Sequence, residues 1–169
     1  DNSKIEAWRK GNELVRQMEL NKKYPAQEGV FFFSARPMLK NPLQICDTLK
    51  NHYFQYHALV PINRNIKTEV SAQPTNLRII KEGKNAVLLW DKVEEDAGKA
   101  VAYYVVYAFK GEKIGNMDNP ASILTKTHHS FLELSDMIQN FEGDYTFVVS
   151  SVNRYKQESE VKDYINLSF

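Results

Sequence analysis

Few side chains in this sequence have the type and spacing that chemistry requires. His128 and His129 are adjacent, and neighbouring side chains on a strand point to opposite faces, so the two cannot chelate one ion together. His52 and His57 lie across a predicted helix end without an evident third ligand, which disfavours a metal site. Cys46 is the single cysteine and has no histidine in register, so a buried helix thiol is favoured over a nucleophile. We therefore expect no metal and no cofactor.

Arg36 is the remaining candidate for a binding role. It follows an apolar run, Gly29 to Ser34, where a guanidinium group could hold a carboxylate or a sugar hydroxyl. A structural ion pair is the alternative interpretation. The sequence contains no Gly-rich phosphate loop, no Cys-x-x-Cys pair and no serine elbow.

Composition limits the class of protein. The chain has 169 residues, enough for one or two small domains, with 43% hydrophobic and 25% charged residues. The net charge is +1 and no basic stripe occurs, so nucleic acid is not an expected partner. No apolar run is long enough to cross a membrane. The first residues do not resemble a signal peptide, so an exported parent would carry its signal upstream.

The first part of the chain has helical patterns around one apolar strand. A capping box at Ser3 predicts a helix over 3–23, the run 29–34 predicts a strand buried on both faces, and Asn41-Pro42 predicts a helix over 42–53. This order is typical of α/β proteins with parallel strands. One strand makes no sheet, so we expect its neighbours to belong to a longer protein.

From Pro74 onwards the apolar pattern has the period of β-strands. Short strands without disulfides in this number are typical of an immunoglobulin-like sandwich. The predicted strands are 77–80, 84–90, 101–109, 123–126, 130–134, 144–152 and 161–169.

Residues 74–169 resemble the fibronectin type III family. The resemblance rests on Trp90 in the second strand, on alternating Tyr103, Val105 and Tyr107, and on Tyr145 at the start of the run Tyr-Thr-Phe-Val-Val-Ser-Ser-Val-Asn. It implies that Trp90, Tyr103, Tyr107 and Tyr145 are core residues, that Tyr104 and Val106 face away from the core, and that the Tyr145 hydroxyl bonds to upstream backbone. The segment 153–158 lacks Arg-Gly-Asp, so integrin binding is not implied.

Residues 1–60 resemble the C-terminal end of the barrel in the glycoside hydrolase-like family 10 proteins, which are exported bacterial relatives of glycosidases. The matching motifs are Gly29-Val30-Phe31-Phe32-Phe33-Ser34, Asn41-Pro42, Asp47-x-Leu49, Tyr53 and Ala58-Leu59-Val60-Pro61.

This second resemblance implies that 29–34 is the last barrel strand, with Ser34 and Arg36 at the rim of a sugar-binding cleft. A glycosidase needs two carboxylates, and none follows the strand within 29–41. Asp47 falls inside the predicted helix, where a solvated role is favoured. We assign no catalytic residue to this chain and expect the carboxylates on earlier strands.

The sequence therefore predicts a mixed fold: an α/β fragment of a β/α barrel over 1–71, then an all-β immunoglobulin-like, fibronectin type III sandwich over 72–169. The leading hypothesis is the C-terminal fragment of an exported or surface-anchored bacterial glycoside hydrolase. Its sandwich would support the barrel by intramolecular packing, and its barrel would bind a poly- or oligosaccharide. One alternative is a non-catalytic carbohydrate- or protein-binding surface module, and another is a structural spacer without a ligand.

Overall fold

A computed structural model describes residues 4, 13–24, 26, 29–32, 35–62, 65–66, 69–83, 85–94, 100–137, 139 and 141–169. The chain divides into two compact units, Asp1–Tyr56 and His57–Phe169, which are described separately. The predicted domain boundary at 71/72 lies inside the second unit.

The first unit is helical in its described part. Its elements are α1 (Glu13–Asn21), α2 (Ala35–Lys40), the 3-10 turn η2 (Pro42–Gln44), α3 (Ile45–Thr48) and the π-helical segment η3 (Leu49–Tyr53). Two buried side chains, Met18 and Leu49, come from α1 and η3. The Tyr53 hydroxyl donates to the Glu19 carboxylate at 2.6 Å and to the Val15 carbonyl at 3.3 Å, which joins α1 to η3.

The predicted helix over 42–53 is broken near its start. Asn41, Leu43 and Gln44 have positive φ angles of 43°, 54° and 58°, which no continuous right-handed helix allows. The Asn41 side chain accepts a 2.8 Å hydrogen bond from the Cys46 amide, in the first turn of the segment that begins at Ile45. Asn41 was predicted as the N-cap of the helix over 42–53, but its side chain makes no cap bond to the turn at Pro42, and the residue that precedes α3 is Gln44.

The predicted strand over 29–34 is absent from its described residues. Residues 29–32 pair with no strand, and Phe31 is 92% exposed instead of buried. A strand needs a hydrogen-bonding neighbour, and the described part of the chain supplies none. The segment that follows, for which no helix was predicted, forms α2. Of the predicted helix over 3–23, α1 covers Glu13–Asn21, and residues 5–12, with Trp8, lie outside the described residues.

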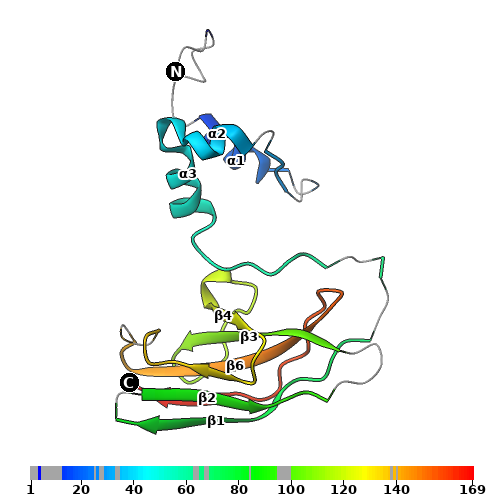
Figure 1. The fold of residues 1–169 in the computed structure, drawn as a ribbon, viewed down its shortest axis with the longest axis vertical. Coiled ribbons are helices and arrows are strands. Elements are labelled where there is room, and N and C mark those ends of the chain that lie inside the picture. Colours follow the sequence, from blue (N-terminus) through cyan, green and yellow to red (C-terminus); the bar gives the residue numbers. More distant parts are fainter. Residues whose placement is uncertain are drawn as a thin grey trace. The chain divides into compact units, whose positions relative to one another are not determined.

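The second unit is a sandwich of two antiparallel sheets, visible as two layers in Figure 1. One sheet has the order β1-β2-β5 and the other the order β4-β3-β6-β7. The bounds are β1 Thr75–Glu82, β2 Asn85–Asp91, β3 Val101–Lys110, β4 Ile123–Thr127, β5 Phe131–Glu133, β6 Asp144–Asn153 and β7 Ile165–Ser168, with the short 3-10 turn η4 at Pro120–Ser122. Each predicted strand overlaps one of these, and the predicted immunoglobulin-like sandwich is present.

The core lies between the sheets, around Trp90. The indole is 2% exposed and meets the Tyr104 ring edge-on at 5.5 Å between centroids. Its Nε1 donor is buried with no partner among the described residues. The other fully buried members are Ala86, Leu88, Val106, Leu134, Phe147 and Val149.

The predicted faces of β3 are reversed. Tyr104 and Val106 pack in the core between the sheets, whereas Tyr103, Val105 and Tyr107 pack on the opposite face of β3. A shift of one residue moves a whole strand's side chains to the other face. Both faces of β3 are apolar and buried, so alternation along the strand does not reveal which side is the core.

Tyr145 also departs from the expected arrangement. Its hydroxyl has no hydrogen bond to any described residue, so the predicted bond to upstream backbone is not formed. Its ring stacks on Phe141 at 4.1 Å and meets Phe169 edge-on at 5.9 Å. The ring therefore closes one end of the core as part of an aromatic cluster.

Candidate functional site

The predicted sugar-binding residues fall in the first unit. Ser34 lies outside the described residues. Arg36 is exposed on α2, and its guanidinium forms no ion pair or hydrogen bond with a described residue. The structural ion pair considered for Arg36 is thus not formed within the described part of the chain, and its predicted role in binding stays a prediction.

Large apolar side chains around Arg36 are exposed. Phe31 is 92% and Leu39 86% exposed, values far above those of core residues. Six more large apolar side chains of this unit are exposed, namely Leu20, Tyr24, Val30, Leu43, Phe54 and Tyr56. A surface of this kind marks an interaction site or a part of a larger core.

The histidines and the cysteine do not form a reactive group. His128 Nδ1 lies 2.8 Å from the Ala102 carbonyl, whereas the His129 ring lies against Phe131 at 5.3 Å. The Cys46 thiol donates to the Met38 carbonyl at 3.0 Å. Among the described residues no three His, Cys, Asp or Glu side chains converge as metal ligands.

The most developed polar site lies on the outer face of the four-stranded sheet. Tyr107 is 1% exposed there, and its hydroxyl donates to Glu158 Oε1 at 2.6 Å. The Ser150 hydroxyl donates to the same oxygen. Burial, reinforced by the hydrogen bond to Glu158, raises the pKa of Tyr107 far above its usual value. Sequence reasoning missed this site because Tyr107 was placed on the core side.

The segment that precedes β1 covers this face. We call its described residues, 57–62, 65–66 and 69–74, the strap. Leu59 packs on a buried cluster of Val105, Tyr107, Phe109, Ile123, Val148 and Val152. Lys126 donates to the Ala58 carbonyl at 3.2 Å, and Ser151 donates to the Ala72 carbonyl at 2.7 Å. The strap is therefore bonded to the sandwich near both of its ends.

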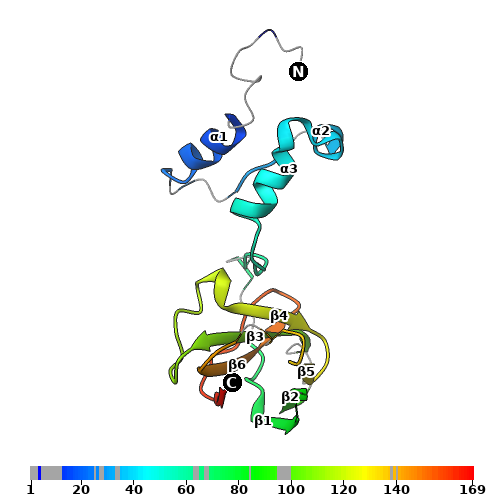
Figure 2. The ribbon, with the colours of Figure 1, turned by 90° about the vertical axis from the view of Figure 1, so that its left-hand side faces the viewer.

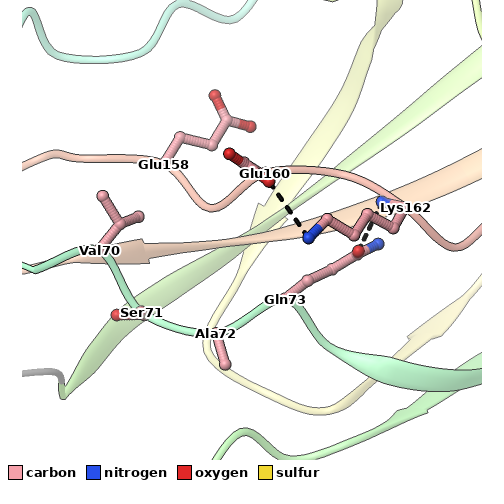
Figure 3. Close-up of a pocket in the computed structure, with 7 residues that line it drawn as sticks. All are labelled: Val70, Ser71, Ala72, Gln73, Glu158, Glu160 and Lys162. Atoms are coloured by element: carbon pink, nitrogen blue, oxygen red, sulfur yellow. Dashed lines mark hydrogen bonds and ion pairs between the residues drawn. The ribbon is translucent and has the colours of Figure 1, made fainter.

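A pocket of about 300 Å³ opens where the strap meets the β6–β7 connection (Figure 3). Glu160 and Lys162 form an ion pair of 3.3 Å whose side chains are 85% and 79% exposed. Gln73 accepts from the Lys162 amide at 2.5 Å and donates to the Asp163 carbonyl at 3.2 Å. The other lining residues are Val70, Ser71, Ala72 and Glu158. Most of these polar groups bond one another, and the described lining contains no paired nucleophile and base. These groups hold the strap against the β6–β7 connection and form no catalytic arrangement.

Comparison with known proteins finds sequence similarity to part of a glycosyl hydrolase. No protein-family model matches the chain. The glycosyl hydrolase YngK of Bacillus subtilis (strain 168) is 31% identical over 155 residues. This match covers 90% of the chain, so it includes residues of both structural units, but only 29% of YngK. The chain is thus homologous to less than a third of a glycosyl hydrolase.

Solved structures resemble the chain more weakly. The spore cortex lytic enzyme SleM of Clostridium perfringens has a TM-score of 0.42 at 12% identity, over 59% of this chain and 28% of that one. Pectate lyase PelI from Erwinia chrysanthemi has a TM-score of 0.39 at 20% identity, over 56% of this chain and 28% of that one. These similarities support no conclusion about activity. No helix of the described residues is long and apolar enough to cross a membrane.

Proposed function

We propose that this chain is the C-terminal part of an exported glycoside hydrolase of the glycoside hydrolase-like family 10 kind. Residues 1–56 would complete its β/α barrel, and the sandwich, of fibronectin type III type, would support that barrel from outside. The observation that carries the proposal is the homology to YngK, which extends through both units of the chain but over only 29% of that hydrolase.

The exposed apolar side chains of the first unit support this assignment. Phe31 and Leu39 bear the type of side chain that belongs in a core, yet they are 92% and 86% exposed. In a barrel, strand 29–34 would pair with neighbouring strands and helices would cover Phe31. A whole barrel takes about 250 residues, more than this chain contains. Arg36, which has no described partner, would be free at the cleft rim to hold a sugar hydroxyl or carboxylate.

The test compares the 169-residue chain with the longer protein encoded by the same gene. Both are assayed for release of reducing sugar from a panel of polysaccharides, bacterial cell walls included. We expect the longer protein to hydrolyse at least one substrate and the chain alone to hydrolyse none. Hydrolysis by the chain alone, or an encoded protein that begins at Asp1, would refute the proposal. Glycan binding by the inactive chain would favour the surface-module alternative.

A variant pair tests the role of Arg36 in the longer protein. Arg36→Ala is expected to raise KM by about 10- to 100-fold, because one charge-assisted hydrogen bond is worth about 1.5–3 kcal/mol. Lys40→Ala removes an exposed charge from the same helix and is expected to leave KM unchanged. An equal effect of the two variants would remove Arg36 from the site. Fractionation of the producing cells tests export.

A further inference from the structure

The outer face of the three-stranded sheet carries an apolar patch that the described chain leaves about half exposed at Ile80 and Phe131, with the His129 ring against Phe131. Ile80 of β1 lies opposite Val87 of β2, and Leu89 of β2 lies opposite Phe131 of β5. Val87 and Leu89 are two residues apart and point to the same face. These four side chains therefore form one contiguous patch across all three strands. Figure 2 shows the backbone of these strands, labelled β1, β2 and β5.

This patch differs from the outer face of the other sheet. On the four-stranded sheet, the strap and the loops cover Val105, Tyr107 and Val148 until they are at most 1% exposed. On the three-stranded sheet, Ile80 remains 52% and Phe131 44% exposed. The sandwich thus buries one of its two outer faces with its own chain and leaves the other apolar centre open.

Charges of both signs surround the patch. At one end Arg78, the neighbour of Leu89 across the strands, forms a 3.1 Å ion pair with Asp91. At the other end Glu133 lies opposite Val87. A mixed rim around an apolar centre matches the composition of protein interfaces, whereas a phosphate-rich ligand would need a basic rim.

The small size of the patch indicates what covers it. A stable complex between separate proteins buries about 800 Å² on each partner, with 20–30 residues a side. Two half-exposed side chains, Ile80 and Phe131, with the partly buried Val87 and Leu89 beside them, fall well short of this. A partner on the same polypeptide needs less area, because the link between them supplies a high effective concentration.

We propose that the outer face of the β1-β2-β5 sheet docks against the part of the hydrolase that lies outside this chain. Ile80 and Phe131 are the central contacts. This inference rests on the proposed function, since it requires the longer protein. It adds the surface through which the sandwich supports the catalytic part.

Thiol labelling tests the contact directly. In a Cys46→Ser background, Ile80→Cys and Phe131→Cys are introduced into the chain and into the longer protein, and maleimide labelling of the relevant peptide is followed by mass spectrometry. We expect labelling in the longer protein to be slower than in the chain by about tenfold or more, a protection of at least 1.4 kcal/mol. Tyr164→Cys is the matched control, because Tyr164 is 48% exposed outside the patch. It should label equally fast in both.

The other possible labelling results each contradict the proposal, and each can be told apart from the others. Equal labelling of Ile80→Cys and Phe131→Cys in the two proteins would show that the patch stays uncovered. Protection that rises with the concentration of the chain would indicate a second copy, and protection only on addition of oligosaccharide would indicate a sugar ligand. Equal rates in an active hydrolase would overturn the docking alone, whereas protection in an inactive protein would overturn the hydrolase assignment alone. Unfolding midpoints of the chain variants verify that both fold.

Discussion

The hydroxyl of Tyr107 donates a 2.6 Å hydrogen bond to the carboxylate of Glu158, which lies 51 residues further along the chain. Tyr107 is on β3, and Glu158 follows the β6–β7 turn, bridged to Val152. The bond therefore holds the connection between β6 and β7 against the middle of the four-stranded sheet. The side chains around it are mostly apolar.

Loss of the Glu158 carboxylate should destabilise the sandwich. Glu158→Ala leaves two donors, the hydroxyls of Tyr107 and Ser150, without their acceptor, and we expect a loss of about 1–3 kcal/mol in the free energy of unfolding. Chemical denaturation of the chain measures it. Glu160→Ala, two residues further on and 85% exposed, is the control and should change stability little. Equal losses for the two variants would mean that the buried bond contributes nothing.

The ionisation of Tyr107 should follow unfolding. Its pKa is raised by burial and by the bond to Glu158, so the folded sandwich favours the protonated phenol. The resulting stabilisation is fully present below the ordinary tyrosine pKa of 10 and is lost as the pH rises beyond it. In an alkaline titration followed by ultraviolet absorbance, we expect one tyrosine, absent in Tyr107→Phe, to ionise only together with the loss of β-structure. Its ionisation in the native sandwich would contradict the assignment.

The pair of Tyr53 and Glu19 predicts a pH window for the first unit. The bond from Tyr53 and the neighbouring Lys22 lower the pKa of Glu19, and the bond to Glu19 raises the pKa of Tyr53 to about 12. The contribution of the pair is present above the ordinary Glu pKa of 4.5 and is lost as the pH falls below it. It is also present below pH 10 and is lost as the pH rises towards 12.

The measurement is the helical circular dichroism of the chain between pH 3 and pH 12, a range whose upper end reaches the raised pKa of Tyr53. Tyr53→Phe should be less helical than the wild type at neutral pH, and the difference should vanish at pH 3 and shrink as the pH rises towards 12. Tyr24→Phe, on an exposed ring, should follow the wild type throughout. A constant difference between wild type and Tyr53→Phe at every pH would show that the hydrogen bond is not responsible.

The strap should be necessary for a stable sandwich. A chain of residues 57–169 retains Leu59 and the bond to Ala58, whereas a chain of residues 75–169 exposes the face of Val105 and Tyr107. We expect the shorter chain to unfold at a lower denaturant concentration and to bind a hydrophobic dye. Loss of Leu59 alone, in Leu59→Ala, should cost about 1–2 kcal/mol, less than a fully buried leucine. Equal stability of the two truncated chains would show that the strap does not stabilise the sandwich.

The strands could be predicted from sequence because their apolar residues alternate and polar turns separate them. Trp90 was recognisable as a core residue for the same reason. The faces of β3 could not be predicted, since Tyr103 to Phe109 are all apolar and both sides of the strand are covered. The packing of the strap on the sheet could not be predicted either. Its bonds, such as that from Ser151 to the Ala72 carbonyl, join residues far apart in the sequence, and no local sequence pattern indicates them.

The N-terminal unit was harder for a different physical reason. The run at 29–32 has the composition of a buried strand, but strand formation depends on neighbours that the described chain does not provide. The short helix α2 was missed because Pro37 follows Arg36 directly and the segment has only six residues, too few for a periodic pattern. Sequence singled out Arg36 as a candidate binding residue, which stays a prediction, and only the coordinates revealed that its guanidinium has no described partner.

The strap moves the boundary of the part of the chain that can be transferred to another protein as a folded domain. Recombination or grafting at the polar stretch before Pro74 would separate Leu59 and Ala58 from the sheet that they cover. The compact unit that contains the sandwich begins at His57 instead. A hybrid enzyme joined there would receive the sandwich with its cover already in place, and fusion at residue 72 would produce a domain prone to aggregation.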